Sequence, residues 1–189
     1  MSEIPEMELK SGEEIPVLGF GTWNLGGDVV KRSVRDALEL GYTHIDTAEG
    51  YHNEEEIGEV LEDYERDRLF LTSKVLPTNL HYDDVLESCN RTLEKLGTSY
   101  LDLYLIHWPN PAISIRETLS AFERLHEEGK VKNIGVSNFS YYQLRIARKI
   151  SELPISVNQV EFHPWYHDEA LLDYCQERDI HLTASAPLA

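Results

Sequence analysis

Apolar residues recur with the helical period of three to four positions in three segments of this chain, and a glycine follows each segment. The segments contain Val30, Val34, Ala37 and Leu38 before Gly41, Leu86, Cys89, Leu93 and Leu96 before Gly97, and Ile115, Leu119, Phe122 and Leu125 before Gly129. This spacing places the apolar residues on one face of a helix, and a glycine is typical of the position where a helix ends. Ser140 and Gln143 have the spacing of a capping box and predict the start of a further helix. Each predicted helix therefore has an apolar stripe that must pack against a sheet.

Short apolar runs lie between these helices and predict seven strands. The predicted strands are Gly19–Thr22, Tyr42–Asp46, Leu69–Lys74, Tyr100–His107, Lys132–Ser137, Ser156–Gln159 and Ile180–Ser185. Strands that alternate with helices in this way indicate βα units and a parallel sheet. Before them, Met7–Leu9 and Ile15–Leu18 flank a Ser11-Gly12 turn, which predicts an N-terminal β-hairpin.

The order of the elements favours a barrel over an open doubly wound sheet, because no G-x-G-x-x-G follows the first strand. A complete barrel of this type has eight strands in about 250 residues. This sequence has 189 residues and about seven βα strands. We therefore expect an α/β fold, a parallel (β/α)8 TIM-type barrel that is incomplete as given, with residues 1–189 in a single domain, the C-terminal part missing and two sheet edges unpaired.

The acidic composition argues against two classes of partner. The chain has 34 acidic and 17 basic residues and a net charge of -17. Such a surface repels the phosphates of nucleic acids and of anionic membranes. Solvated helix faces and adaptation to a salty cytoplasm both explain the charge, and composition does not choose between them.

The two cysteines and the N-terminus predict where the protein resides. Cys89 and Cys175 occur in helical patterns and not in a C-x-x-C spacing, so we expect buried thiols and neither a disulfide nor a zinc site. The N-terminus has no basic or apolar signal, and no apolar run approaches the ~20 residues of a membrane span. A soluble, cytoplasmic protein is expected.

Polar residues end three successive predicted strands. They are Asp46, Lys74 and His107. A β/α barrel places its active site at these carboxyl ends, and neighbouring strands lie about 4.8 Å apart, so we expect the three side chains to meet at equivalent heights. Tyr51 follows Asp46 closely and fits the role of a proton donor. A nearby ammonium is expected to lower the pKa of its phenol, with Asp46 holding Lys74 charged.

Each of these residues also has a structural explanation when taken singly. Asp46 fits a helix cap, Lys74 a surface charge and His107 a hydrogen-bonded core histidine. A lysine and an aspartate at the ends of apolar strands are costly unless they are paired, however. The combination therefore favours a functional site.

Several motifs in order resemble the aldo-keto reductase family, and within it the diketogluconate-reductase-like branch of bacteria and archaea. The motifs are Leu18-Gly19-Phe20-Gly21-Thr22-Trp23, Asp46-Thr47-Ala48-x-x-Tyr51, Leu105-Ile106-His107-Trp108-Pro109, Ile134-Gly135-Val136-Ser137-Asn138-Phe139 and Asn158-Gln159-Val160-Glu161-Phe162-His163-Pro164. They cover nearly the whole chain. The resemblance implies reduction of aldehydes and ketones to alcohols by hydride transfer from a nicotinamide cofactor, NADPH by family expectation, with NADH still open.

The resemblance also implies roles for individual residues. Tyr51 protonates the carbonyl oxygen, Lys74 and Asp46 tune it, and His107 orients the carbonyl. The implied cofactor-binding residues are Gly21, Thr22, Asp46, Ser137, Asn138, Gln159, Ser185, Pro187 and Leu188, and the implied substrate-binding residues are Trp23, His107 and Trp108.

Alternatives remain for some of these assignments. Ser137 and Asn138 precede a predicted helix and could cap it, and isolated tryptophans are often core residues. Ser185 occupies the position of a family aromatic residue that stacks on the nicotinamide, so weaker stacking is expected. The family's adenine and 2′-phosphate contacts lie largely in the eighth-strand region, which this sequence lacks.

Other readings of the sequence remain open. His163 and His167 could be imagined as a metal pair, but Pro164 and the absence of H-E-x-x-H argue against a metal site. The acidic run Asn53–Ile57 could attract cations, but acidic residues also simply suit the dipole in the first turn of a helix. A lysine that ends a barrel strand could also serve a Schiff-base aldolase.

The family fold predicts a monomer and a small-molecule carbonyl substrate. An incomplete barrel could instead lack activity, or could act as a scaffold that pairs its open edges with another chain.

Overall fold

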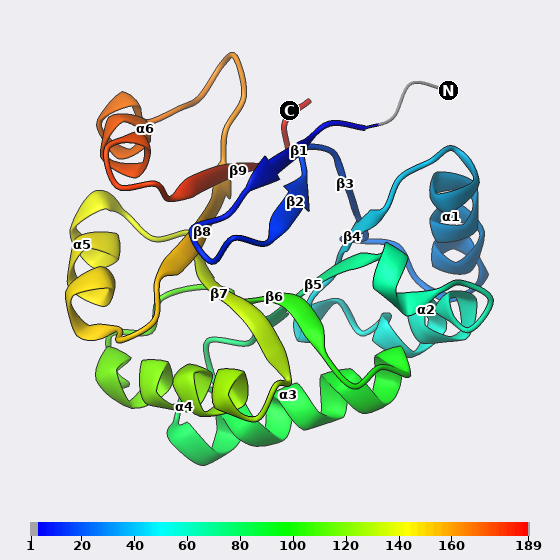
Figure 1. The fold of residues 1–189 in the computed structure, drawn as a ribbon, viewed down its shortest axis with the longest axis horizontal. Helices are drawn as coiled ribbons and strands as arrows, with labels where there is room; N and C mark the ends of the chain where they lie inside the picture. Colours follow the sequence, from blue (N-terminus) through cyan, green and yellow to red (C-terminus); the bar gives the residue numbers. More distant parts are fainter. Residues whose placement is uncertain (1–3, 189) are drawn as a thin grey trace.

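The computed structural model describes residues 4–188, and a parallel sheet of seven strands organises it. Neighbouring strands in the sheet follow chain order. They are β3 (Gly19–Gly21), β4 (His44–Asp46), β5 (Phe70–Val75), β6 (Leu101–Ile106), β7 (Val131–Ser137), β8 (Ile155–Glu161) and β9 (His181–Ser185). Figure 1 shows that the sheet curls into an arc with the helices on its outer side. The prediction of a barrel-type α/β fold with about seven strands is confirmed, and the strand ends agree within two residues.

Six helices follow the strands along the outside of the arc (Figure 1). They are α1 (Gly27–Glu39), α2 (Glu54–Leu61), α3 (Tyr82–Leu96), α4 (Ile115–Glu127), α5 (Tyr141–Ile150) and α6 (Glu169–Gln176). Two short 3-10 turns, η1 (Glu49–Tyr51) and η2 (Arg66–Arg68), flank α2. Within residues 4–188 no helix has both the length and the apolar character needed to cross a membrane.

The predicted helix ends are present in the structure. Gly41, Gly97 and Gly129 have φ angles of 92°, 63° and 71°, in the left-handed region that glycine adopts without strain. Gly97 is the C-cap of α3, and the other two follow the last residues of α1 and α4. Ser140 and Gln143 form the predicted capping box at the start of α5.

Side chains of β5 alternate between an outer and an inner core, because successive residues of a strand point to opposite faces. On β5, Leu71 and Val75 belong to the large cluster between the sheet and the helices, whereas Phe70 belongs to a second cluster. This second cluster, inside the arc, consists of Leu9, Ile15, Phe70, Leu103, Leu105 and Val157. Lys74 has the same parity as Phe70 and is therefore directed to the inside.

An N-terminal hairpin supplies part of the inner core. Strands β1 (Glu6–Glu8) and β2 (Glu14–Pro16) pair antiparallel, as predicted, around a turn in which Gly12 has a φ of 88°. Leu9 and Ile15 are 2% and 6% exposed. Figure 1 shows the hairpin across the middle of the arc.

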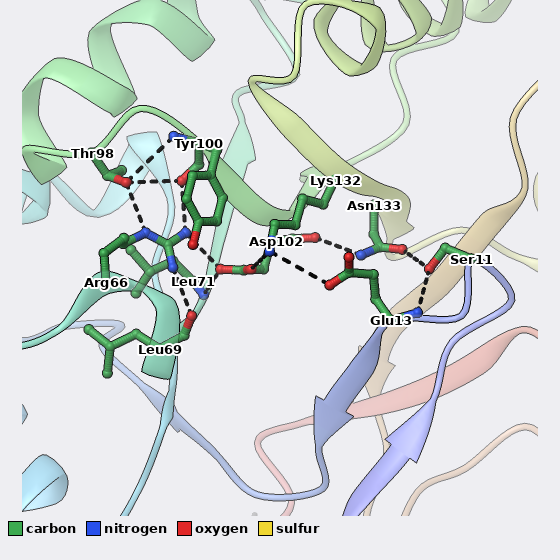
Figure 2. Close-up of polar contacts among 10 residues, drawn as sticks. All are labelled: Ser11, Glu13, Arg66, Leu69, Leu71, Thr98, Tyr100, Asp102, Lys132 and Asn133. Atoms are coloured by element: carbon green, nitrogen blue, oxygen red, sulfur yellow. Dashed lines mark hydrogen bonds and ion pairs between the residues drawn. The ribbon is translucent and has the colours of Figure 1, made fainter.

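A buried carboxylate organises the amino-terminal end of the sheet (Figure 2). Asp102 is 4% exposed, and its Oδ2 accepts hydrogen bonds from Arg66 at 2.7 Å and from the Leu71 amide at 2.9 Å. Lys132 lies 3.3 Å from its Oδ1. Arg66 and Lys132 both lie against the ring of Tyr100, at 3.8 and 4.5 Å from its centroid. The negative charge is therefore matched by two cations.

The same network holds the hairpin in place (Figure 2). Asn133 donates to the Asp102 carbonyl oxygen at 3.0 Å and accepts from the Ser11 hydroxyl at 2.5 Å. Lys132 also lies 3.7 Å from Glu13. Because these contacts occupy the amino-terminal end of the sheet, its carboxyl end is left for other chemistry.

Candidate active site

Asp46 and Lys74 form a buried ion pair at the carboxyl ends of β4 and β5. The Lys74 ammonium donates to Asp46 Oδ1 at 2.5 Å and to the Thr47 carbonyl oxygen at 2.9 Å. The lysine side chain is fully buried, and that of Asp46 is 14% exposed. Burial of a lone ammonium would be costly, and this carboxylate compensates its charge. The surface-charge explanation for Lys74 is therefore wrong.

The two residues are staggered along the sheet and do not lie at equal heights. Asp46 is the register partner of Thr72, whereas Lys74 lies opposite Leu105 of β6. Such an offset between neighbouring strands is a property of curled, barrel-like sheets. The long lysine side chain spans the difference.

Gln159 of β8 binds the same carboxylate from the opposite side of the arc. Its Nε2 donates to Asp46 Oδ2 at 2.7 Å, although the two residues are 113 positions apart in sequence. Asp46 is thus held by Lys74 through one oxygen and by Gln159 through the other. Among residues 4–188, no donor binds the Oε1 of Gln159.

Tyr51 and His107 complete the predicted group. Tyr51 is the last residue of η1, the turn that follows β4, and its ring centroid lies 5.2 Å from the Lys74 ammonium nitrogen. The rings of Tyr51 and His107 are 5.6 Å apart at an angle of 76°. The structure therefore brings Asp46, Tyr51, Lys74 and His107 together at one end of the sheet.

The pKa of Tyr51 shifts in the direction opposite to the one predicted. Burial raises the pKa of its phenol above 10.0, and the lowering by Lys74 does not outweigh this effect. The ammonium is evident from the sequence, whereas the loss of water around the ring depends on the fold. The consequence is a phenol that stays protonated near neutral pH, which suits a proton donor.

His107 is neutral at physiological pH. Burial, and next the Lys74 ammonium, lower the pKa of its imidazole from 6.5 to about 4, while Asp46 acts weakly in the opposite sense. Its Nδ1 is buried without a hydrogen-bond partner among residues 4–188. A neutral imidazole has one N–H donor, so the ring can donate a hydrogen bond to an oxygen without transferring a proton.

Ser137 and Asn138 lie beside this group and do not cap a helix. The N-cap of α5 is Ser140. Asn138 has a left-handed backbone with a φ of 61°, and its Nδ2 donates to the His107 carbonyl oxygen at 3.0 Å and to Ser137 Oγ at 3.1 Å. The Ser137 hydroxyl donates to the Gln159 carbonyl oxygen at 2.9 Å. These contacts join the ends of β6, β7 and β8.

Thr22 is likewise tied to the group. Its amide and hydroxyl both donate to the Asp46 carbonyl oxygen, at 3.0 and 3.1 Å, and Gly21 is the register partner of Asp46. Trp23 and Trp108 follow β3 and β6 and are 74% and 53% exposed, so neither is a core residue.

Ser185, Pro187 and Leu188 lie at the end of β9. The Ser185 carbonyl oxygen accepts from the Phe162 amide at 3.3 Å, and Pro187 lines a cavity with Phe162 and His163. Within residues 4–188, none of the three forms a hydrogen bond or ion pair with the Asp46, Tyr51, Lys74 and His107 group.

His163 and His167 do not form a helical pair. His163 lies in a short turn, where its Nε2 is 3.0 Å from Glu161 and its Nδ1 accepts from the Trp165 amide at 3.3 Å. His167 precedes α6 and contacts the Phe162 ring at 5.5 Å. Over the described part of the chain, no three His, Cys, Asp or Glu side chains gather in a way that could hold a metal ion.

Asn53 is a buried link that the sequence did not reveal. Its Nδ2 donates to the carbonyl oxygens of Thr22 at 2.9 Å and Leu25 at 2.8 Å, and its Oδ1 accepts from the Thr47 hydroxyl at 2.8 Å. It therefore joins the loop after β3 to the loop after β4. The sequence includes Asn53 only as part of the run Asn53–Ile57 and gives it no role in the site.

Glu54 is a buried acid within the run Asn53–Ile57, which the sequence alone explains by the helix dipole. It does lie in the first turn of α2, but it is 1% exposed and its Oε1 accepts from Ser73 at 2.7 Å and Thr92 at 2.9 Å. Burial raises the pKa of this carboxyl group. The dipole interpretation is therefore incomplete for this residue.

Comparison with known proteins points to one family. A sequence model described as the aldo/keto reductase family matches residues 17–189. An aldo-keto reductase of Arabidopsis thaliana is 40% identical over 206 residues, which cover 98% of this chain and 65% of that protein. A glyoxal reductase of Bacillus subtilis is 40% identical over 185 residues, covering 96% and 67%. The chain thus spans about two thirds of the length of these relatives.

Solved structures agree with this match. A thermostable aldo-keto reductase, crystallised with the inhibitor epalrestat, superimposes with a TM-score of 0.94 at 44% identity and covers 97% of this chain and 73% of its own. A Bombyx mori aldo-keto reductase in complex with NADP gives 0.93 at 32% identity, covering 98% and 67%.

Proposed function

This chain belongs to the aldo/keto reductase family, and from that premise we propose that it reduces aldehydes or ketones to alcohols with NADPH. The observation that carries the proposal is the convergence of Tyr51, Lys74 and His107 at the carboxyl end of the sheet. An acid, a cation and a neutral hydrogen-bond donor around one point are the groups that carbonyl reduction requires.

In the proposed reaction Tyr51 donates its phenolic proton to the carbonyl oxygen of the substrate. Its raised pKa keeps the phenol protonated before the reaction, and Lys74 stabilises the phenolate that the transfer leaves behind. Asp46 pairs with Lys74 and orients it. His107, held by Asn138 through its carbonyl oxygen, donates a hydrogen bond that orients the substrate oxygen.

The residues around the group fit a nicotinamide carboxamide, which requires both donors and acceptors. The Oδ1 of Asn138 and the Oε1 of Gln159 accept no hydrogen bond within residues 4–188, and Gln159 Nε2 donates only to Asp46. These two amides and Ser137 would hold the carboxamide, and Thr22 and Gly21 adjoin them. When bound, the cofactor supplies the hydride. NADPH is proposed as that cofactor because the Bombyx mori relative was solved with NADP.

The proposed substrate is a small carbonyl compound. Trp23 and Trp108 expose large apolar surfaces after β3 and β6, next to Thr22 and His107. Aromatic side chains of this kind commonly line binding pockets. A cytoplasmic location is also proposed, because Cys89 and Cys175 are buried free thiols.

The environment of Lys74 favours reduction over Schiff-base chemistry. An imine forms from a neutral amine, whereas this nitrogen donates to Asp46 and to the Thr47 carbonyl oxygen and is fully buried. Treatment with borohydride and a ketose is therefore expected to give no adduct on Lys74.

The test is oxidation of NADPH with a panel of reactive aldehydes and α-dicarbonyls, using the wild-type chain, Tyr51→Phe and Tyr142→Phe. Tyr142 is a matched control because it is 71% exposed on α5. We expect Tyr51→Phe to lower kcat by roughly 10²- to 10⁴-fold, the usual contribution of a general acid, and Tyr142→Phe to leave it unchanged. Wild-type activity that survives in Tyr51→Phe would refute the role of Tyr51. A folded wild-type chain without turnover would refute the activity proposed for this chain.

A further inference from the structure

We propose that Glu49 is a positioning residue, which fixes the turn carrying Tyr51 against the segment that follows Lys74. The inference rests on the proposed function, because it concerns the placement of the proposed acid. Glu49 and Tyr51 are the first and last residues of η1.

The Glu49 carboxylate accepts hydrogen bonds from four donors outside its own turn. Its Oε2 accepts from the Leu76 amide at 3.1 Å. Its Oε1 accepts from Asn79 Nδ2, Ser88 Oγ and Arg91, each at 3.1 Å. Two of these donors lie on α3 and two lie in the segment between β5 and α3. The carboxylate therefore joins η1 to both neighbouring elements.

The anchor is partly shielded from water, which makes it stronger than an ordinary surface pair. The Glu49 side chain is 12% exposed, whereas that of its partner Arg91 is 44% exposed. The hydrogen bond to Glu49 raises the pKa of Arg91. A carboxylate that accepts hydrogen bonds from four donors has little freedom to move.

A second contact joins the same two segments. A Cβ atom added at Gly50 would lie 2.8 Å from Leu76 Cδ2, so η1 packs directly on this leucine. Leu76 follows the last residue of β5 and is two positions beyond Lys74. The turn is thus fixed to the end of β5 by the carboxylate of Glu49 and by close packing at Gly50.

This attachment sets the geometry between the proposed acid and its cation. The Tyr51 ring lies 5.2 Å from the Lys74 ammonium and 5.6 Å from the His107 ring, and neither separation is fixed by a covalent or strand-pairing contact of Tyr51. Without Glu49 the turn could move relative to β5. A displacement of about 1 Å in a catalytic group can cost about 10²-fold in rate.

The carboxylate acts through the turn and not on the substrate. All of its donors belong to α3 or to the segment between β5 and α3. Glu49 is also absent from the charges that shift the pKa of Tyr51. Its loss should therefore change the placement of Tyr51 rather than its electrostatic surroundings.

Glu49→Gln tests the proposal, with Glu87→Gln as its matched control. Glu87 also pairs with Arg91, at 2.7 Å, but its side chain is 71% exposed and, within residues 4–188, forms no hydrogen bond or ion pair with η1. The amide nitrogen of glutamine donates hydrogen bonds and does not accept them. In Glu49→Gln this nitrogen therefore lies next to other donors, and some of the four hydrogen bonds are lost. Glu49→Asp is a second variant, which keeps the charge but is one methylene too short, in case the first does not fold.

Two readouts are required on the full chain. The first is kcat for an active aldehyde, with the Kd of NADPH measured separately by fluorescence. The second is the nuclear Overhauser effect between the ring protons of Tyr51 and His107, which needs no turnover. We expect the Glu49 variant to lose roughly tenfold or more in kcat at unchanged Kd and to show a weakened Overhauser effect. Glu87→Gln should match the wild type in both.

The outcomes separate this proposal from the proposed function. A Glu49 variant that keeps the wild-type kcat or the wild-type Overhauser effect overturns the positioning role. Equal losses in Glu87→Gln overturn it as well, because the effect would then belong to Arg91. If the wild type shows no turnover, the proposed function fails. In that case the Overhauser effect alone tests the positioning role of Glu49. A signal that weakens only in the Glu49 variants supports this role, and an unchanged signal overturns it.

Discussion

Lowering the pH is expected to destabilise the fold through His107. The pKa of this imidazole is about 4 in the folded chain, because burial and the Lys74 ammonium both oppose its protonation. In the unfolded chain the group has its ordinary pKa near 6.5. Between these two values the unfolded state binds more protons than the folded state, so stability falls as the pH falls. The contribution of His107 to the free energy of unfolding is fully present above about pH 6.5 and is lost by about pH 4.

The structure sets the size of this effect. A difference of about 2.5 pH units corresponds to about 3 kcal/mol, since one unit is about 1.36 kcal/mol. This is an upper limit, because the His107 ring is only partly buried and water screens part of the charge. An effect of about 2 kcal/mol between pH 7 and about pH 4.5 is therefore the expected outcome.

Urea unfolding of the wild type and of His107→Gln at several pH values measures this pH-dependent loss of stability. Glutamine keeps a polar side chain of similar size but does not titrate, and the many carboxylates titrate in both proteins, so their contributions cancel in the comparison. We expect the wild type to lose about 2 kcal/mol more than the variant over this pH range. An NMR titration of the His107 ring should give a midpoint near 4. Equal pH dependence in the two proteins, or a midpoint near 6.5, would refute the reasoning.

Two further predictions concern stability away from the site. Gly58→Ala on α2 should cost about 3 kcal/mol in urea unfolding, because its Cβ would collide with the Lys95 carbonyl oxygen on α3. Gly26→Ala, with open space around it, should cost less, about 0.5–1 kcal/mol, because it loses only the preference for glycine over alanine at the N-cap of α1. A mild Gly58→Ala would show that the two helices can separate freely. Arg66→Gln should cost about 3 kcal/mol, because it leaves the buried Asp102 with one cation instead of two (Figure 2). A loss that persists at the same size in an Asp102→Asn background would exclude this explanation.

Much of the fold follows from local features of the sequence. Short apolar runs predicted the strands within two residues of their ends, and Gly41, Gly97 and Gly129 marked where helices stop. These features are local, because a helix or strand repeats its geometry over a few residues and a left-handed residue acts only on its own backbone. The alternation of strand and helix then indicated a parallel sheet.

The sequence also predicted that four polar residues come together at one end of the sheet. Asp46, Lys74 and His107 were identified by their place at the ends of successive strands, and Tyr51 by its distance from Asp46. Strand ends in a parallel sheet gather at one edge whatever the detailed packing. Their catalytic and cofactor-binding roles remain predictions, which the Tyr51→Phe experiment addresses.

Distances and burial were decided only by the tertiary structure. Gln159 binds Asp46 although the two residues are 113 positions apart in sequence. Asp46 lies opposite Thr72 of β5, whereas the sequence predicted that it lies at the same height as Lys74. Both depend on how far the sheet curls and how its strands are staggered, and no local pattern encodes either quantity.

Residues near the site show most clearly that burial is not encoded in the local sequence. Glu54 and Glu55 are neighbours of one residue type, yet Glu54 is buried against Ser73 and Glu55 is exposed. Likewise, the pKa of Tyr51 is the balance between burial, which raises it, and Lys74, which lowers it. Charge is a property of the residue and can be read from the sequence. The loss of water around that charge is a property of the packed structure, because it depends on every segment that folds over the group.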